Sequence, residues 1–146
     1  MWFMIHLFQR LGQTDRIKEC IETIRWQLEL GWDSQYGGLL LAIDAGKSPW
    51  ETKWDLKIWW PHTEALYALL LGYSISREEW CLEWFKRIHD YSFQHFPVPR
   101  HGEWIQNLDR QGRKIAGTVA LPVKDPFHLS RALILSVGVL KGLAER

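Results

Sequence analysis

The chain has 146 residues and a formal net charge of +1, from 18 lysine and arginine residues against 17 aspartate and glutamate residues. This length suits a single domain with a sizeable core, and the balanced charge gives no electrostatic reason to expect binding to nucleic acid or to an anionic membrane. No stretch approaches the roughly 18 unbroken apolar residues of a membrane span, and the apolar amino terminus lacks the features of a signal peptide. Cys20 and Cys81 are isolated and predict buried, reduced thiols. We therefore expect a cytoplasmic protein.

Two helices are predicted at the amino-terminal end. Residues 1–11 are apolar almost all round and are followed by Gly12, which predicts a helix with neighbours on several sides. Thr14 is placed to cap a second helix, and apolar residues recur at helical spacing over 17–28.

Residues 31–58 and 97–124 lack helical periodicity. In the second segment, residues 103–105 and 114–116 flank a turn-like sequence at 109–112, which predicts a β-hairpin.

Three further helices are predicted. One begins at Trp59 and ends near Gly72, and the next begins with a capping box formed by Ser76 and Glu79. The last begins at Asp125-Pro126, with the aspartate as N-cap. The apolar face that this last helix should bury consists of Leu129, Ala132, Leu133, Val137, Leu140 and Leu143.

The order of these elements is helix, helix, long loop, repeated. This period predicts an all-α array of helical hairpins packed side by side, with the long loops on one rim.

Tryptophan is the outlying residue type, with ten in the chain. Core packing explains most of them, but Trp50, Trp54, Trp59 and Trp60 form a dense cluster in a loop-like segment. Exposed indole rings can stack on the apolar faces of sugars while their N–H groups donate to hydroxyls. The cluster therefore favours a sugar-binding surface.

The stretch from Trp59 to Ala65 gathers indole, imidazole and carboxylate groups where a helix begins, and Pro61 suits the first turn of that helix. We interpret Trp59, Trp60, His62 and Glu64 as a candidate site. A structural interpretation stays open: Glu64 would complement the helix dipole, and His62 would be a hydrogen-bonded core histidine.

His128 lies in the first turn of the last predicted helix, where the helix dipole favours the neutral imidazole that a general base requires. Arg131 follows one turn later and could hold a developing negative charge. The alternative is a histidine that is only hydrogen-bonded. The remaining histidines, His6, His89, His95 and His101, have no comparable setting. His89 and His95 are expected at the surface.

The sequence contains no convincing metal-ligand spacing and no glycine-rich phosphate loop. The candidate groups therefore predict acid–base chemistry on a polyol without a metal or an organic cofactor.

Four motifs follow one another along the chain, at residues 31–39 (GWDSQYGGL), 57–65 (KIWWPHTEA), 102–104 (GEW) and 127–131 (FHLSR). Together they resemble the N-acylglucosamine 2-epimerase family, to which cellobiose 2-epimerases and mannose isomerases are related. The Trp-Trp-Pro-His form is nearer the N-acylglucosamine branch, because cellobiose epimerases tend to carry glutamine where His62 stands.

The resemblance implies an (α/α)6 barrel with its active site at one mouth. Residues 1–146 would form the C-terminal portion of a single such domain, with about five helices and two long rim loops. The family's second catalytic histidine and a site arginine would precede Met1, so we expect this chain alone to have little or no epimerase activity. Helix faces left uncovered would favour self-association or a homodimer.

The resemblance implies a sugar substrate, with His128 as one of two catalytic histidines and Glu64 as a supporting catalytic carboxylate. The resemblance also implies that Trp59, Trp60 and His62 line the sugar pocket, and Arg131 is expected to bind the sugar from its place one turn after His128.

Epimerisation at C2 of an open-chain aldose requires removal of the proton next to the carbonyl and its return to the opposite face. His128 would act on one face, while Arg131 offsets charge on the enediolate. A single base moving the proton between C2 and C1 would instead give an aldose–ketose isomerase of the mannose type, so both reactions stay open.

Two other classes also stay open. A glycoside hydrolase or lyase on the same fold would need a second carboxylate opposite Glu64, for which Glu103 and Asp33 are the loop candidates. A non-catalytic segment would bind sugar or protein through the tryptophan-rich rim.

Overall fold

The computed structural model of the protein describes residues 1–44, 53–115 and 124–145, and helices dominate these ranges. The helices are α1 (Trp2–Leu11), α2 (Thr14–Gly31), α3 (Trp59–Ser76), α4 (Glu79–His95) and α5 (Phe127–Ala144). Short strands accompany them, namely β1 (Lys57–Ile58), β2 (Pro97–Val98), β3 (Glu103–Trp104) and β4 (Asn107–Leu108), with a 3-10 turn at Pro99–His101. The all-α prediction is confirmed.

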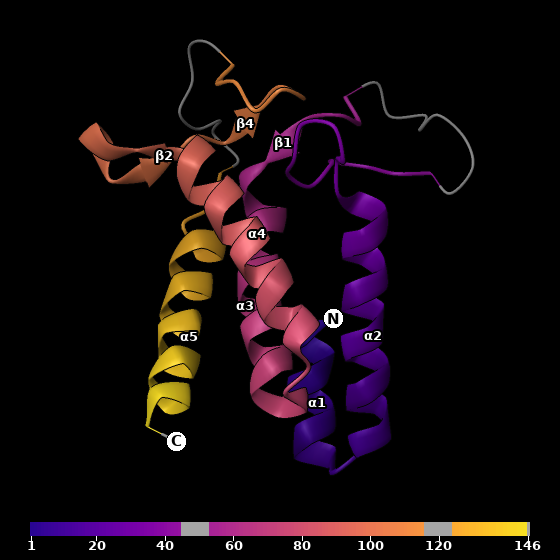
Figure 1. The fold of residues 1–146 in the computed structure, drawn as a ribbon. Coiled ribbons are helices and arrows are strands. Elements are labelled where there is room, and N and C mark those ends of the chain that lie inside the picture. The colour runs from indigo at the N-terminus through magenta and orange to yellow at the C-terminus, as the bar shows by residue number, and fades with distance from the viewer. Residues whose placement is uncertain (45–52, 116–123, 146) are drawn as a thin grey trace.

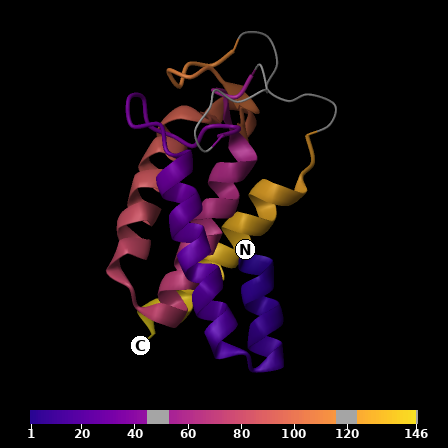
Figure 2. The same cartoon turned by 90° about the vertical axis from the view of Figure 1, so that its right-hand side faces the viewer.

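The helices lie alongside one another, and β1, β2 and β4 lie together at one end of them (Figure 1; Figure 2). Helix α3 is the centre of the arrangement, because it packs against α1, α2, α4 and α5. Ten of its residues are buried, and Leu69 and Leu70 are fully so. A helix that is apolar all round needs such neighbours on every side.

Some helix boundaries follow local sequence signals and others do not. Gly12 ends α1 in the left-handed conformation, with φ of 66°, as predicted. Helix α2 begins at Thr14 with Gln13 as its N-cap, so the threonine is not the cap. Helix α3 passes through Gly72 and ends at Ser76. Gly72 therefore does not end the helix, and a Cβ there would make an ordinary contact with Cys81 Sγ at 3.5 Å.

The predicted capping box is wrong, whereas the predicted cap of the last helix is correct in its chemistry. Ser76 Oγ donates to the Gly72 carbonyl and accepts the Glu78 N–H. Helix α4 therefore starts after Glu78 without a side-chain cap. At α5 the Asp125 carboxylate accepts the backbone N–H groups of Phe127 and His128, as an N-cap does, although the helix begins one residue later than expected.

The predicted hairpin is also wrong in its pairing. Strand β3 pairs with β2, and β4 pairs with β1, both antiparallel. The turn at 109–112 is closed by an isolated bridge between Leu108 and Lys114 and by backbone hydrogen bonds between Asp109 and Arg113 and between Gly112 and Asp109. Ala116, the last residue of the expected hairpin, lies outside the described residues, as does Trp50.

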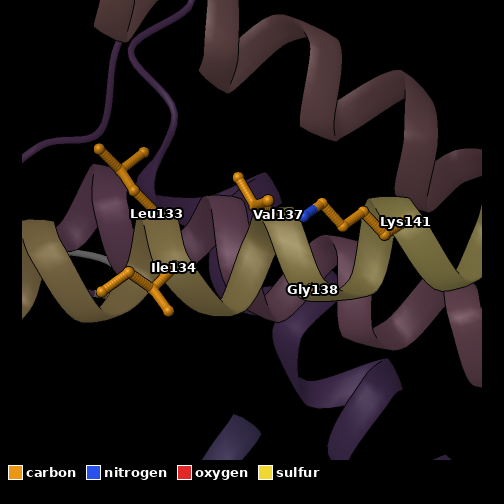
Figure 3. A pocket seen from close by; sticks show the side chains of 5 residues that line it. All are labelled: Leu133, Ile134, Val137, Gly138 and Lys141. Carbon is orange, nitrogen blue, oxygen red and sulfur yellow. The ribbon is translucent and has the colours of Figure 1, made fainter.

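Helix α5 buries only part of the face predicted: Ala132 is buried and Leu129 packs against the core, as expected. Ala132 and Ser136 are buried, whereas Val137 and Leu140 are 49% and 44% exposed and Ile134 is 70% exposed. An open cavity of about 410 Å³ runs along this surface, with Leu133, Ile134, Val137 and Lys141 projecting around it (Figure 3). The prediction was wrong for Val137 and Leu140 because α5 is apolar on several sides, so periodicity does not single out the buried one.

Among the described residues, α5 is also the one helix long and apolar enough to cross a membrane. Its mean hydropathy over Phe127–Ala144 is 1.4, and 11% of that window is buried. This is weak support for a span, because core helices of soluble proteins have the same length and composition.

The exposed apolar residues on α5 predict self-association. We expect the chain, whose monomer mass is 17.3 kDa, to elute in size-exclusion chromatography with light scattering at a mass of at least two copies. Replacing Ile134 and Val137 by lysine should lower this mass to that of the monomer. The prediction is wrong if the unmodified chain is monomeric at about 100 μM.

Candidate active site

Glu64 is the centre of the candidate site. One carboxylate oxygen, Oε1, accepts a hydrogen bond from His128 Nδ1 at 2.8 Å and another from Arg131 Nη2. The other oxygen, Oε2, accepts the Trp2 indole N–H at 2.6 Å. Helices α1, α3 and α5 thus meet at a single carboxylate, and the predicted catalytic pair of Glu64 and His128 is in direct contact.

The orientation of His128 follows from these bonds. A carboxylate only accepts hydrogen bonds, so Nδ1 carries the proton and Nε2 is left as the basic nitrogen. Among the described residues, the nearest acidic oxygen to Nε2 belongs to Asp125, at 3.8 Å, beyond hydrogen-bond range. The imidazole lies against two predicted sugar-binding rings, at centroid distances of 5.7 Å from Trp59 and 5.5 Å from Trp60.

The two tryptophans differ in accessibility. Trp60 is 43% exposed and can present its ring to a ligand, whereas Trp59 is 2% exposed. The buried Trp59 ring packs against the His128 imidazole, and Lys124 Nζ lies 4.8 Å from the centroid of Trp59. Of the pair, only Trp60 is placed to stack on a sugar.

Arg131 is held among aromatic rings. Its guanidinium carbon lies 3.6 Å from the Phe127 centroid and 4.9 Å from that of Trp2, and its side chain is 14% exposed. Nη2 binds Glu64, while Nε and Nη1 are buried without a hydrogen-bond partner among the described residues. Because these donors are sealed from solvent beside aromatic rings, Arg131 is placed to act on a nearby negative charge through its own positive charge.

His62 does not join this cluster, so its predicted contact with the sugar is not what the structure shows. Its ring is fully buried, Nε2 accepts the Leu39 N–H at 2.9 Å, and Nδ1 donates to the Ile58 carbonyl at 2.7 Å. Burial disfavours the charged ring more than the bond to Ile58 favours it, and this lowers the pKa of His62 to about 3. The structural alternative, a satisfied core histidine, is the correct one.

The lowered pKa predicts a pH dependence of stability. The unfolded chain binds a proton at His62 near pH 6.5 and the folded chain only near pH 3, so the unfolded state holds more protons between these values. The free energy of unfolding should therefore fall on acidification through this window, by up to about 1.4 kcal/mol per pH unit from this residue. We expect His62→Gln to show a shallower fall than the unmodified chain in urea titrations at pH 7, 6 and 5. Identical pH dependence of the two proteins would contradict the assignment.

A cavity of about 600 Å³ borders the cluster. Glu64, Trp60 and Trp2 form part of its wall, and most of the rest is apolar, including Leu39 and Ala65. The cavity can therefore take an apolar substituent of a ligand next to the carboxylate.

The two carboxylates considered for a glycoside hydrolase are occupied elsewhere. Asp33 is buried and accepts hydrogen bonds from Lys57 Nζ at 2.9 Å and Arg110 Nε at 3.0 Å. Burial opposes its charge, but these two bonds outweigh burial and hold the pKa of Asp33 well below its usual value. Glu103 binds Lys124 at 3.0 Å, and its pKa is also lowered, because this pair and the Trp104 N–H outweigh burial. Neither is suited to act as a general acid at neutral pH.

One histidine expected at the surface is partly buried. His95 Nδ1 hydrogen-bonds the Gly112 carbonyl at 2.9 Å, and its ring stacks on Tyr91 at 4.4 Å. His89 is also only partly exposed, and its ring stacks on Phe93 at 4.5 Å. No group of three or more histidine, cysteine, aspartate or glutamate side chains arranged to hold a metal ion occurs within 1–44, 53–115 and 124–145.

The sequence profile of the N-acylglucosamine 2-epimerase family matches residues 1–132. The chain belongs to this family. It is 33% identical to the N-acylglucosamine 2-epimerase of Mus musculus and 38% identical to that of Bos taurus, and in each case 99% of this chain matches 35% of the relative. The chain thus spans about a third of the length of these epimerases.

Solved structures agree on the fold. Cellobiose 2-epimerase from Bacillus thermoamylovorans superposes with a TM-score of 0.76 at 15% identity, over 96% of this chain and 37% of that structure. A D-mannose isomerase superposes with a TM-score of 0.68 at 19% identity, over 76% of this chain and 28% of that structure. The cellobiose 2-epimerases are (α/α)6 barrels, so the predicted fold class is confirmed and this chain forms part of such a barrel.

The sequence did not indicate the contacts that Trp2 and Lys124 make with residues of the site. Trp2 was expected only as an apolar residue of the first helix, yet its N–H binds Glu64. Lys124 joins the start of α5 to β3, through the Trp104 carbonyl and Glu103, as well as contacting Trp59. No local signal in either segment indicates these contacts, because their partners lie 20 or more residues away in the sequence.

Proposed function

We propose that this chain supplies an acid–base centre for a sugar 2-epimerase or isomerase, with His128 as the base. The observation that carries the proposal is the Glu64–His128 hydrogen bond, which orients a basic Nε2 beside the exposed ring of Trp60. Membership of the N-acylglucosamine 2-epimerase family supports the same reaction class.

In the proposed reaction, His128 Nε2 takes the proton from C2 of an open-chain aldose. The electron pair of the broken C–H bond forms the C1–C2 double bond of an enediolate, and negative charge moves to the C1 oxygen. The positive charge of Arg131, held beside Glu64, offsets this charge, while Glu64 stabilises the imidazolium of His128. Return of a proton to the opposite face of C2 by a second acid–base group completes epimerisation. Its return to C1 completes an isomerisation.

We propose an N-acylglucosamine and its N-acylmannosamine epimer as the substrate pair. The largely apolar cavity beside Glu64 and Trp60 suits an acyl substituent, and the mouse and cattle relatives are N-acylglucosamine 2-epimerases. A mannose-type aldose–ketose isomerase is the second candidate, favoured by the structural match to D-mannose isomerase. A non-catalytic sugar-binding role is the third.

Abstraction of a proton next to a carbonyl requires only acid–base groups, so we propose that no metal or organic cofactor takes part. We also propose that the protein acts in the cytoplasm. Inversion calls for two such groups, and loss of one typically costs about 10²–10⁴ in rate. The chain alone should therefore be a poor epimerase.

The test is proton NMR in D₂O with N-acetylmannosamine, N-acetylglucosamine and mannose. It uses the chain itself and a chimera in which the chain replaces the matching third of the mouse epimerase. Deuterium should enter C2 of the N-acetylated sugars with the chimera and much more slowly with the chain. Exchange with mannose only, accompanied by fructose, would favour the isomerase. Sugar binding without exchange in either protein would favour the non-catalytic role.

A further inference from the structure

We propose that His62 is a positioning residue: its neutral imidazole ties the segment after α2 to the start of α3 and thereby fixes Trp60 and Glu64. The proposal rests on the function proposed above for the chemistry that these residues serve. Its geometric basis is independent of that function.

The two ring nitrogens of His62 hold two backbone segments together. The Leu39 N–H can only donate and the Ile58 carbonyl can only accept, so the bonds to Nε2 and Nδ1 fix the tautomer with its proton on Nδ1. Both nitrogens are fully used, and none is left for a sugar hydroxyl.

The ring cannot easily turn away from these bonds. It stacks on Tyr91 at a centroid distance of 5.4 Å and an interplanar angle of 16°, and it contacts Phe96 at 4.9 Å. Phe96 is fully buried and Tyr91 nearly so. A ring held in this way keeps the backbone groups of Leu39 and Ile58 at a fixed separation through its two hydrogen bonds.

The two hydrogen-bond partners of His62 lie next to the candidate site. Ile58 is the N-cap residue of α3, so its position sets where the first turn places Trp60 and, one turn later, Glu64. Leu39, at the other end, lines the same cavity as Trp60 and Glu64. One buried side chain therefore fixes both the helix that carries the carboxylate and one wall of the cavity beside it.

Two substitutions separate positioning from bulk stability. Glutamine carries one N–H donor group and one carbonyl acceptor and can replace both bonds, whereas leucine can replace neither. Leu69→Ala is the matched control, because Leu69 is fully buried on α3 but belongs to the apolar core. The readouts are the NMR resonances of the Trp60 indole N–H and of the His128 ring without sugar.

We expect His62→Leu to shift the Trp60 and His128 resonances, His62→Gln to return them towards the unmodified values, and Leu69→Ala to leave them in place while lowering stability. The proposal is overturned if His62→Leu leaves both signals unchanged, if glutamine behaves as leucine does, or if Leu69→Ala shifts them equally.

If His62→Leu does not fold, a measurement on the unmodified chain tests the proposed role of His62 instead. Ring ¹⁵N shifts of His62 should show the proton on Nδ1, unchanged from pH 5 to 8 and on addition of N-acetylmannosamine. A proton on Nε2, or a sugar-dependent shift that points to direct contact, would overturn the proposal.

Sugar exchange in the chimera separates this proposal from the proposed function. If exchange occurs, His62→Leu should slow it by about 10- to 100-fold, since small misplacements of reacting groups have effects of this size, and His62→Gln should recover most of it. Absence of exchange in every protein would refute the function, while the resonances would still decide the role of His62.

Discussion

His128→Gln is expected to lower the rate of C2 proton exchange by about 10²–10⁴-fold in whichever protein, chain or chimera, shows that exchange. The glutamine amide can still donate to Glu64, so the arrangement of Glu64 and Arg131 should persist. The amide has no basic nitrogen, and proton abstraction is therefore the step that the substitution removes. Sugar affinity, measured by tryptophan fluorescence, should change by less than about threefold.

His89→Gln provides the matched control, because it makes the same replacement on a partly exposed residue of α4 that pairs with Asp90 and not with Glu64. Its exchange rate should equal that of the unmodified protein. Equal rates for the His128 and His89 variants would exclude His128 as the base. A large loss of sugar affinity in His128→Gln would instead assign the histidine to binding.

Helix positions could be predicted because their signals are local. The left-handed Gly12, Pro61 in the first turn of α3 and the Asp125 carboxylate at the start of α5 each act within a few residues of themselves. The pairing of β1 with β4 joins Lys57 to Leu108, and nothing near either residue specifies the other. The hairpin was mispredicted for this reason.

The residues of the candidate site could also be identified from local signals, whereas the contacts between them could not. Glu64, His128 and Arg131 were each identified from their place in a helix, but their meeting at one carboxylate is a property of how α3 packs against α5. The burial of His62 depends on Tyr91 and Phe96, which lie about 30 residues further along the chain. A histidine beside two tryptophans suggests a ligand contact until the neighbours on its other side are known.

The end of the helices where β1 and β4 lie carries a buried ion pair, between Lys57 and Asp33, whose disruption should be costly. Lys57 is fully buried and Asp33 is 3% exposed, and Arg110 binds the same oxygen of Asp33. Burial lowers the pKa of Lys57, partly offset by the Asp33 carboxylate. The other oxygen of Asp33 accepts backbone N–H groups of the following turn, from Gln35 and Tyr36.

Asp33→Ala is therefore expected to lower the free energy of unfolding by about 3–5 kcal/mol, because it leaves the Lys57 ammonium buried without a counterion. Lys57→Met should cost much less, since Arg110 still pairs with Asp33. Combining Asp33→Asn with Lys57→Met removes both buried charges and keeps an acceptor for the turn, so the double variant should be more stable than Asp33→Ala. Urea unfolding followed by circular dichroism measures all three. Equal losses for Asp33→Ala and Lys57→Met would mean that the shared turn, and not the stranded charge, determines the stability of this end of the molecule.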